Sequence, residues 1–511
     1  MAEGRGPGLV SIVGAGPGDP GLLTIRGRRA VERADLVLYD RLASPALLAS
    51  VEVPGQERIH VGKTASEGLS QQERINALMV RRALAGERVV RLKGGDPMIF
   101  GRGGEEMEAC VEAGVPFEVV PGVSSISAVP AFAGVPLTHR DAASVFTVVT
   151  GHERGPGEPE EARVDWEALG RVGGSLVVLM GVHQAARWSQ ALMRGGRARD
   201  TPVLATRWGT TPRQRTLETT LGELAGAVHD EAFRPPAVVV VGDVVRYRAA
   251  LSWFEARPLM GQVVGVTRSG RDDASEFEAL EALGAAVVHV PLTRQVPVDD
   301  GRPLADAVRD GDFSDLVLTS QNGVHALCEA LVRSGRDVRT LAGVTTWAVG
   351  PATARAMRSM LALGADHVAS PATGEGLVAM ARELGVQGRR FLFPSAAAAR
   401  EVVPEGLRAL GAELRQIAAY ATEPDPLAAP RLESAFEQGL SLLAIASPSA
   451  VDALEGALRA TGRGVGDVAL AAIGPTTAEH ARARGFDVAV TAETHTMTGL
   501  AAAITERLSR G

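Results

Sequence analysis

Lysine is nearly absent from this chain. Of its 53 basic residues, only Lys63 and Lys93 are lysines, and all the others are arginines. A sequence with this bias uses arginine wherever any surface cation suffices. The two lysines are therefore candidates for sites that need an ammonium, a compact three-donor charge whose pKa shifts readily on desolvation. The alternative is that both are chance survivors.

Other scarcities exclude whole classes of protein. The two cysteines, Cys110 and Cys328, are far apart in the sequence, which favours reduced thiols and a cytoplasmic location. The ten histidines form no His-x-x-x-His or Cys/His cluster, so we expect no metal site. No apolar run approaches the ~18 residues of a membrane span, and the first residues lack the apolar segment of a signal peptide. We expect no membrane association.

The net charge of −7 over 511 residues is acidic and unevenly distributed. Residues 1–258 hold 30 basic and 30 acidic residues, whereas residues 259–511 hold 23 and 30. No block of Lys and Arg exists, so we expect no nucleic-acid partner. The length predicts two or three domains.

The first half alternates short apolar runs with amphipathic patterns, which predicts βαβ units and an α/β fold. Ser70 and Glu73 form a capping box for a helix ending at Leu84. We place the main boundary at residues 257/258, with sub-domains of about 8–140 and 141–250 separated by a Gly/Pro/Glu-rich loop. The expected strands are Leu9–Val13, Leu36–Tyr39, Arg88–Leu92, Phe117–Val120, Ser175–Met180 and Ala237–Val241.

The second half, residues 258–511, contains an internal repeat. Leu318–Val324 is echoed by Ala446–Val451, Val349–Ala354 by Ile473–Ala478, and Glu375–Leu377 by Thr498–Leu500, at offsets of 123 to 127 residues. Each unit reads as strand, Ser/Thr turn, helix, strand, Gly-Pro turn, helix. Two α/β lobes with a ligand cleft between them are the expected architecture. A duplicated module without a ligand is the alternative.

A glycine-rich turn, Gly14–Asp19, follows the first expected strand and precedes a helix. Asp40 ends the next strand, where a ribose-binding acid belongs in a dinucleotide fold. The fit fails because Asp19 occupies the third glycine position, and because Pro17 removes an N–H that a pyrophosphate needs. A nicotinamide-dependent oxidoreductase is thus disfavoured.

From Val10 to about Trp253 the chain resembles the tetrapyrrole methylase family, specifically its uroporphyrinogen-III C-methyltransferases. The motifs that carry the resemblance are Val13–Pro20, Tyr39–Leu42, Val61–Lys63, Arg88–Pro97, Phe100–Glu106, Val120–Ser125, Pro136–Asp141 and Thr150–His152. The resemblance implies two α/β sub-domains with S-adenosylmethionine held in a folded pose between them, and a homodimer. The implied cofactor contacts are Pro17, Gly94, Gly95, Asp96, Ile99, Ser124, Ser125, Met180 and Gly209.

The same resemblance assigns Asp40 as proton acceptor and Lys63 as proton donor, with Arg41 beside the substrate. A pyrrole carbon that attacks the methyl group must later lose charge, which suits a nearby carboxylate base. The alternative for Asp40 is a strand-end acid paired with Arg41. The family gives Lys93 no chemical role, and a structural lysine is the better interpretation there.

Two segments depart from the family pattern. Arg207-Trp208-Gly209-Thr210 stands where Glu-Asn-Gly-Thr is usual, and Ser124-Ser125 where Thr-Ala or Thr-Ser is usual. The glycine and the hydroxyls remain, so we expect cofactor binding to persist with altered side-chain contacts.

From about Met260 onward the chain resembles the uroporphyrinogen-III synthases. That family has two α/β lobes joined by a pair of strands, which implies one lobe from about 261–293 plus 424–511 and another from 294–423. The motifs that carry the resemblance are Val266–Arg268, Thr319–Val324, Val349–Ala354, Tyr420–Thr422, Ser447–Val451 and Ile473–Ala478.

These synthases cyclise hydroxymethylbilane, which carries eight carboxylates, with loss of water. The resemblance makes Tyr420 the acid for the departing hydroxyl, and the alternative is a packed strand tyrosine whose OH is satisfied. In this acidic half, uncharged hydrogen-bond donors can bind carboxylates. These donors are Ser and Thr hydroxyls and backbone N–H groups at strand-to-helix turns. The expected substrate contacts there are Thr267, Arg268, Ser320, Ser447, Thr476 and Thr477.

Together the two resemblances predict a bifunctional enzyme that makes uroporphyrinogen III and methylates it at C-2 and C-7, giving precorrin-2 for sirohaem or cobalamin. Two alternatives remain: a later corrin methylase fused to the synthase, and a methyltransferase regulated by a non-catalytic two-lobed ligand-binding domain.

Overall fold

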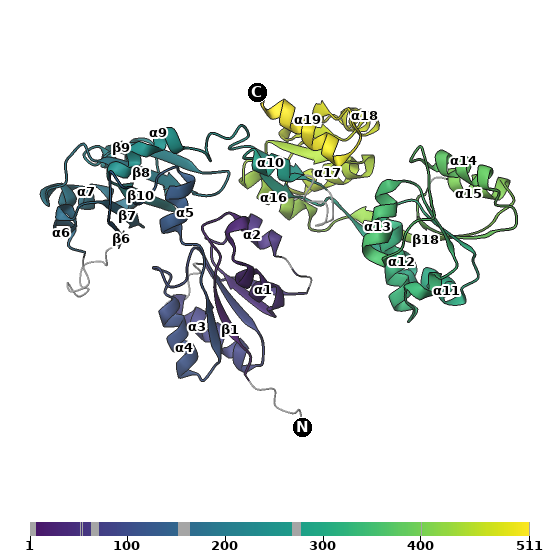
Figure 1. The fold of residues 1–511 in the computed structure, drawn as a ribbon, viewed down its shortest axis with the longest axis horizontal. Coiled ribbons are helices and arrows are strands. Elements are labelled where there is room, and N and C mark those ends of the chain that lie inside the picture. Colours follow the sequence, from purple (N-terminus) through teal and green to yellow (C-terminus); the bar gives the residue numbers. More distant parts are fainter. Residues whose placement is uncertain are drawn as a thin grey trace.

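Four β-sheets, each covered by helices, make up the structure. This computed structural model describes residues 7–51, 53, 55–62, 71–151, 164–267, 277–399 and 401–509. Figure 1 shows the sheets as separate units, with the first at the bottom, the second at the left, the third at the top centre and the fourth at the right. The expected α/β fold class is confirmed.

The first sheet is parallel, in the order β3-β2-β4-β1-β5. Most residues of its inner strands are apolar because helices cover both faces, and Arg91 and Lys93 of β4 are buried exceptions. Val10 and Ile12 pack into one buried cluster and Val13 into the opposite one. The strands are β1 (Val10–Gly14), β2 (Leu36–Tyr39), β3 (Glu57–His60), β4 (Val89–Lys93) and β5 (Phe117–Val120), and the helices are α1 (Ile25–Arg33), α2 (Pro45–Ser50), α3 (Gln71–Leu84) and α4 (Gly103–Glu112).

The second sheet is mixed, in the order β6-β7-β10-β8-β9, and only β6 and β7 are parallel. Trp166 and Trp188 stack within its main apolar cluster, with ring centroids 5.7 Å apart. The strands are β6 (Phe146–Thr150), β7 (Ser175–Leu179), β8 (Pro202–Arg207), β9 (Arg215–Thr220) and β10 (Ala237–Val241), and the helices are α5 (Ser125–Phe132), α6 (Trp166–Arg171), α7 (Ala185–Arg194), α8 (Leu224–Asp230) and α9 (Arg248–Leu251).

The third sheet is parallel and is built from two separated stretches of the chain. Its order is β12-β11-β19-β20-β21, so strands near residue 263 pair with strands beyond residue 442. The strands are β11 (Val263–Val266), β12 (Ala286–His289), β19 (Leu442–Ile445), β20 (Ala469–Ala472) and β21 (Asp487–Thr491), and the helices are α10 (Glu278–Ala282), α16 (Ala428–Glu437), α17 (Pro448–Ala460), α18 (Pro475–Ala483) and α19 (Met497–Ser509).

The fourth sheet has the order β13-β18-β17-β14-β15-β16. The antiparallel pair β13 and β18 leads from this sheet to the third one (Figure 1). The strands are β13 (Thr293–Pro297), β14 (Asp315–Leu318), β15 (Thr345–Ala348), β16 (His367–Val368), β17 (Arg390–Ala396) and β18 (Glu413–Pro424), and the helices are α11 (Arg302–Asp310), α12 (Gln321–Arg333), α13 (Pro351–Leu361), α14 (Gly374–Leu384) and α15 (Val402–Ala409).

The internal repeat is confirmed by matching backbone conformations at equivalent turns. Ser320 begins α12 with φ −159° and ψ 161°, and Ser447 begins α17 with φ −157° and ψ 155°. Gly350 and Gly474, before α13 and α18, have φ −177° and −176°. The same turn chemistry thus produces the same strand-to-helix connections in both sheets.

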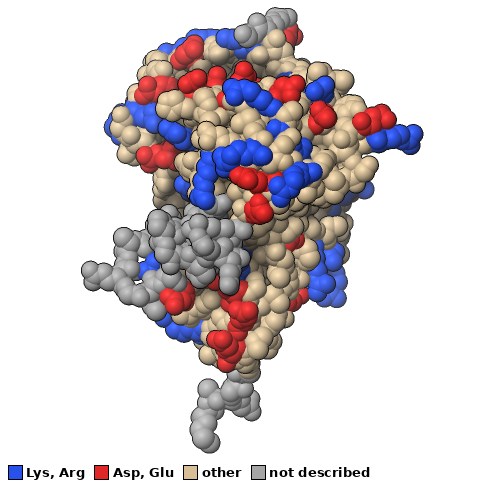
Figure 2. Space-filling model, turned by 90° about the vertical axis from the view of Figure 1, so that its left-hand side faces the viewer, with Lys and Arg blue, Asp and Glu red and all other residues tan. Residues whose placement is uncertain are grey.

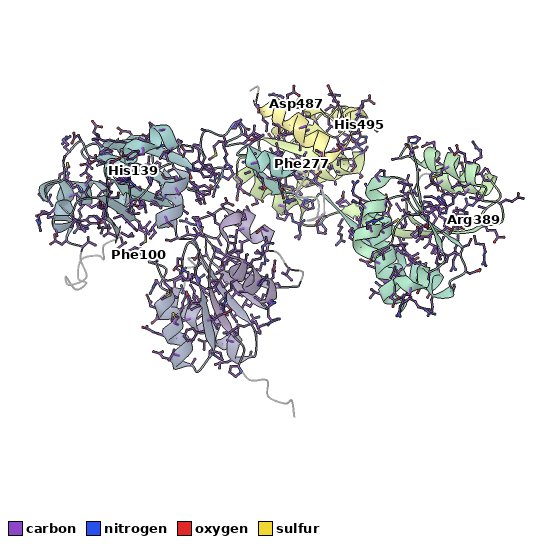
Figure 3. The ribbon with its side chains drawn as sticks, in the orientation of Figure 1. Phe100, His139, Phe277, Arg389, Asp487 and His495 are labelled. Carbon is purple, nitrogen blue, oxygen red and sulfur yellow. The ribbon has the colours of Figure 1, made fainter. Side chains whose placement is uncertain are left out.

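A buried ion pair holds the centre of the fourth sheet. Asp315 is fully buried, and its Oδ1 accepts a hydrogen bond from Trp347 Nε1 at 2.7 Å. Arg389, labelled in Figure 3, donates from Nε to Asp315 Oδ2 at 2.9 Å. The carboxylate is therefore paired and hydrogen-bonded, as a buried charge must be.

Residues 248–262 connect the second sheet to the third, and the start of this segment is fixed to the first half. Trp253 Nε1 donates to Ala131 O at 3.1 Å, and the Phe254 ring lies 4.7 Å from that of Phe132. The Glu255 carboxylate accepts hydrogen bonds from Gln214 Nε2 at 2.9 Å, Thr216 Oγ1 at 2.6 Å and Arg248 Nη2 at 2.5 Å.

The end of the connector is fixed to the second half. Arg257 Nη1 donates to Glu281 O at 3.1 Å, and Leu259 N to Leu283 O at 2.8 Å. Leu259 is fully buried in the apolar cluster of the third sheet. The connector is therefore packed on both sides and sets the position of the third sheet against the first half.

The surface of the second-sheet unit carries both signs of charge. On the face in Figure 2, basic and acidic side chains are interspersed over the upper part, and large areas below are uncharged. Within the described residues, no helix combines the length and the apolar character needed to cross a membrane.

Replacement of Glu255 by alanine tests the anchoring of the connector. Gln214 and the largely buried Arg248, whose side chain is 11% exposed, would lose a charged partner. We expect the free energy of unfolding to fall by about 2–4 kcal/mol. Urea unfolding followed by tryptophan fluorescence measures this loss. Glu223→Ala, at an exposed position, is the control, and an equal shift in both variants would contradict the anchoring role.

Candidate active sites

Glycine loops at the carboxyl ends of β1, β4 and β5 meet by direct backbone contact. Gly95 N donates to Gly16 O at 2.7 Å, and Gly16 N to Gly95 O at 3.2 Å. A Cβ on Gly122 would lie 2.2 Å from Gly95 O, and one on Gly14 2.5 Å from Gly122 Cα. Gly95 also has a φ of +66°. Only glycine permits this close approach and this conformation.

A cavity of about 620 Å³ opens next to these loops. Five of the nine expected cofactor contacts line it: Pro17, Gly94, Gly95, Ser125 and Gly209. It also lies at the carboxyl ends of parallel strands, the usual ligand position in open α/β sheets.

The other four expected contacts, Asp96, Ile99, Ser124 and Met180, are not among the lining residues. Asp96 accepts hydrogen bonds from Met98 N at 2.8 Å and Gly122 N at 3.1 Å, so its carboxylate holds two loops together. Ser124 caps α5. Ile99 and Met180 are exposed. Phe100, the neighbour of Ile99, lies on the side of its unit that faces the second sheet (Figure 3).

The second half of the chain supplies part of the cavity wall. Glu281 from α10, the edge strand β12 and Gln438 all line it. Glu281 lies near Asp19 of the first glycine loop. Burial, reinforced by the negative charges of Asp19 and Glu278, raises the pKa of Glu281. The cavity is therefore bounded by both halves.

Arginines from three segments line the same cavity: Arg41, Arg213 and Arg257. The Arg213 guanidinium lies 4.8 Å from the centroid of Trp208. Desolvation lowers the pKa of the neighbouring Arg207, and repulsion from Arg213 and other arginines adds to the effect. The departure from the family pattern at residue 207 thus adds to a surplus of positive charge.

Asp40 lies directly after β2 and is partly exposed, at 28% of its side chain. Its Oδ1 accepts from Leu42 N at 2.9 Å, and its Oδ2 lies 3.4 Å from Arg91 Nη2. The ion pair is thus with Arg91 and not with Arg41. Arg91 Nε also donates a hydrogen bond to Glu106 Oε1 at 3.0 Å, and Lys93 Nζ donates one to the same oxygen at 2.8 Å.

Lys93 is buried, as a structural lysine would be. Desolvation, with the charge of Arg91, lowers its pKa against the opposing effect of Glu106. Lys63, the other lysine, and the Ser70 cap lie outside the described residues. In the described part of the chain, no cluster of His, Cys, Asp and Glu can hold a metal ion.

In the second half, two expected residues are in contact. Tyr420 OH and Ser320 Oγ are 2.7 Å apart, although 100 positions separate them in the sequence. Ser320 Oγ also accepts from Gly323 N at 3.0 Å. Tyr420 is 8% exposed. It therefore has the features of a packed strand tyrosine whose OH is satisfied.

The remaining expected residues of this half belong to the third sheet. Thr267 Oγ1 donates to Ala444 O at 2.9 Å, and Ser447 Oγ caps α17 by accepting from Ala450 N at 3.2 Å. Thr476 is exposed and Thr477 is buried. Arg268 lies outside the described residues. Figure 1 shows the third and fourth sheets apart, so the four described residues of this set are not next to Ser320 and Tyr420.

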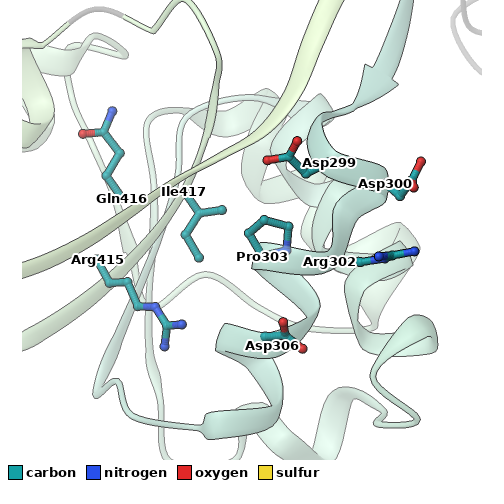
Figure 4. Close-up of a pocket in the computed structure, with 8 residues that line it drawn as sticks. All are labelled: Asp299, Asp300, Arg302, Pro303, Asp306, Arg415, Gln416 and Ile417. Carbon is teal, nitrogen blue, oxygen red and sulfur yellow. The ribbon is translucent and has the colours of Figure 1, made fainter.

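A second cavity, of about 670 Å³, lies in the fourth-sheet unit (Figure 4). It is formed by the turn after β13, by α11 and by β18. Three carboxylates and two guanidiniums line it: Asp299, Asp300, Asp306, Arg302 and Arg415. This acidic lining does not suit a ligand rich in carboxylates, and it contains none of the expected site residues.

Sequence reasoning missed the partners that surround the expected residues. Arg91 and Glu106 were not identified, although Arg91 and Lys93 alternate in an apolar run and so share one face of β4. Charges at such positions predict a buried partner. Arg213, Arg257 and Glu281 had no sequence signal, because their position depends on packing between distant segments.

Comparison with known proteins finds a different family for each half of the chain. The family of tetrapyrrole (corrin/porphyrin) methylases matches residues 9–225, and the uroporphyrinogen-III synthase HemD family matches residues 275–502.

Three relatives represent these matches. The uroporphyrinogen-III C-methyltransferase of Bacillus subtilis is 41% identical over 338 residues, 65% of this chain and 68% of that protein. The porphyrin biosynthesis protein HemD of Ruminiclostridium josui is 35% identical over 416 residues, 81% of this chain and 82% of its own length. An S-adenosyl-L-methionine-dependent uroporphyrinogen III methyltransferase of Methanosarcina barkeri is 47% identical over 240 residues, 47% of this chain and 92% of the relative.

The second of these relatives extends across both halves, as this chain does. The chain belongs to the tetrapyrrole methylase family through its first half and to the uroporphyrinogen-III synthase family through its second.

Proposed function

We propose that residues 1–257 transfer methyl groups from S-adenosylmethionine to C-2 and C-7 of uroporphyrinogen III, giving precorrin-2. Residues 258–511 supply that substrate by cyclising hydroxymethylbilane with loss of water. The observation that carries the proposal is the cavity at the glycine loops, because Arg41, next to Asp40, lines it together with five of the expected cofactor contacts. The homodimer implied by the resemblance is part of the same proposal.

The cavity suits S-adenosylmethionine in size and in lining. Its volume of about 620 Å³ is typical of small-molecule sites. Glycines without Cβ atoms let backbone carbonyls approach a sulfonium, whose activated methyl group is what the cofactor supplies. Pro17, Gly94, Gly95, Ser125 and Gly209 would hold the cofactor, with Asp96, Ile99, Ser124 and Met180 as the remaining proposed contacts.

Asp40 is the proposed base. After a pyrrole carbon gains a methyl group, the ring must lose a proton, and a carboxylate at hydrogen-bonding distance accepts it. Asp40 is partly exposed, and its neighbour Arg41 lines the cavity. Lys63 is the proposed proton donor.

Positive charge around the cavity matches the substrate. Uroporphyrinogen III carries carboxylates on every ring, and Arg41, Arg213 and Arg257 present guanidiniums suited to bind them. Fixed charges also orient the macrocycle over the methyl donor, which accounts for much of the acceleration in bimolecular steps.

In the second half, we propose that Tyr420 donates the proton to the departing hydroxyl, with Ser320 orienting its OH. Arg268, Thr267, Ser447, Thr476 and Thr477 would bind carboxylates from the other lobe. Closure of the lobes about β13 and β18 would bring the two sets together and exclude water.

The first experiment supplies hydroxymethylbilane to the purified chain with and without S-adenosylmethionine. We expect uroporphyrinogen III without the cofactor and a dimethylated product with it, identified by chromatography and mass spectrometry. Formation of uroporphyrinogen I alone would overturn the synthase assignment. In that case, added uroporphyrinogen III would still test the methyltransferase separately.

Asp40→Asn removes the proposed base and keeps the side-chain volume. We expect methylation of uroporphyrinogen III to fall by about 10²-fold or more, while cyclisation of hydroxymethylbilane by the same molecule is unchanged. Both rates are measured on one preparation, so cyclisation reports on folding. Asp200→Asn, at an exposed turn, is the control. Methylation at the wild-type rate would remove Asp40 from the mechanism.

Tyr420→Phe removes the proposed acid of the second half. We expect the opposite of the Asp40→Asn result, with cyclisation impaired and methylation retained. Cyclisation falls by about 10²-fold, and methylation of supplied uroporphyrinogen III persists. Tyr247→Phe, in the first half, is the matched control. If cyclisation is unaffected, Tyr420 is a packing residue. If the parent chain also fails to cyclise the substrate, the two lobes form a ligand-binding domain.

A further inference from the structure

A buried charged cluster lies behind Asp40. Arg91 and Lys93 project from the same face of β4 and are 3% and 4% exposed, and Glu106 on α4 is completely buried. Charged side chains are almost never buried to this degree unless they are paired. One of only two lysines in an arginine-rich chain therefore lies in its most buried ionic cluster, beside the proposed base.

The cluster is connected atom to atom. Glu106 Oε1 accepts hydrogen bonds from Lys93 Nζ at 2.8 Å, Arg91 Nε at 3.0 Å and Gln72 Nε2 at 3.1 Å. The other oxygen, Oε2, is buried and has no hydrogen-bond partner among the residues that the structure describes. Arg91 is also held by the carbonyls of Leu38 and Leu92, and its Nη2 reaches Asp40 at 3.4 Å.

The crowding at Glu106 Oε1 explains a lysine at position 93. Two cations share one carboxylate oxygen, with the planar guanidinium of Arg91 already on one side. A compact ammonium fits beside it, whereas a second guanidinium fork needs more room and more acceptors. The lysine is thus selected by geometry in a chain that otherwise uses arginine.

The formal charges of the cluster cancel. Arg91 and Lys93 are cations, and Glu106 and Asp40 are anions. A proton taken up by Asp40 leaves a net positive charge in a region where solvent screens little, so every member of the cluster affects how readily Asp40 accepts it.

We propose that Lys93 and Glu106 are positioning residues that act through Arg91 to hold the Asp40 carboxylate and to set its proton affinity. The proposal rests on the role of Asp40 as the base for methyl transfer. Neither residue touches substrate, and the effect is electrostatic and geometric.

Lys93→Met is the first test. It removes one positive charge and leaves the cluster with a net formal charge of −1. Loss of a nearby positive charge makes protonation of the Asp40 carboxylate more favourable, so a higher pH is needed to keep the base ionised. The acid limb of the pH profile of kcat/KM for methylation moves up by about 0.5–1 pH unit.

The double variant Lys93→Met/Glu106→Gln restores a neutral cluster. We expect its acid limb to return to the wild-type position, even if kcat remains reduced. If Lys93 and Glu106 had a purely structural role, the second substitution would lower kcat further. Neither variant would then shift the acid limb of the pH profile. Glu108→Gln, an exposed change of the same kind on α4, is the matched control and leaves the profile unchanged.

Two further measurements distinguish a variant that does not fold from one that folds and has altered methylation. The cyclisation rate and the thermal unfolding midpoint report whether each variant is folded. If Lys93→Met does not fold, Lys93→Arg replaces it, and we expect a reduced kcat with an unshifted limb because the charge is kept. A shifted limb in Lys93→Arg would then overturn the proposal.

The remaining outcomes distinguish failure of this proposal from failure of the proposed function. An acid limb that does not move in folded Lys93→Met, or does not return in the double variant, overturns the proposal while leaving Asp40 as the base. Wild-type methylation by Asp40→Asn instead overturns the function on which the proposal rests.

Discussion

The close backbone contact between the loops after β1, β4 and β5 is the constraint on which the first half depends. Gly95 hydrogen-bonds to Gly16 in both directions, and any Cβ on Gly122 would overlap Gly95 O. This contact brings the ends of three parallel strands together and forms the floor of the cavity. Asp96 strengthens it by accepting N–H groups from two of the loops. The glycine motifs are thus required first for the backbone and only then for a ligand.

The connector of residues 248–262 extends that constraint to the second half. Glu255 fixes its start to the second sheet, and Leu259 is buried in the core of the third. Because both ends are anchored, α10 and β12 are held over the cavity in the first half. The edge strand β12 and Glu281, whose pKa is raised by burial, therefore form part of the cavity wall.

The sequence predicted the parts of this structure that are local. Apolar runs located Leu36–Tyr39 and Ala237–Val241 correctly, because strands covered on both faces are continuously hydrophobic. Edge strands β3 and β9 were missed because each contains a single apolar residue, Ile59 in β3 and Leu217 in β9. Glycine motifs identified the cavity loops.

The charged partners were not predictable in the same way. The contact of Arg91 with Asp40, or of Glu281 with Asp19, depends on how distant segments pack. The lysine count was the one compositional signal that pointed to the buried cluster, and it did so because arginine replaced lysine almost everywhere else.

The arrangement of the second half limits how a substrate rich in carboxylates is bound there. The hydroxyls of Ser320 and Ser447 already accept N–H groups of their own helices, and Tyr420 OH is used by Ser320. Each serine hydroxyl keeps only limited donor capacity, so neither lobe alone presents enough groups for eight carboxylates. Backbone N–H groups at the helix N-termini are dispersed over two sheets that lie apart in Figure 1. Binding of the proposed substrate would therefore require both lobes at once, and within the described residues the strands β13 and β18 connect the two lobes.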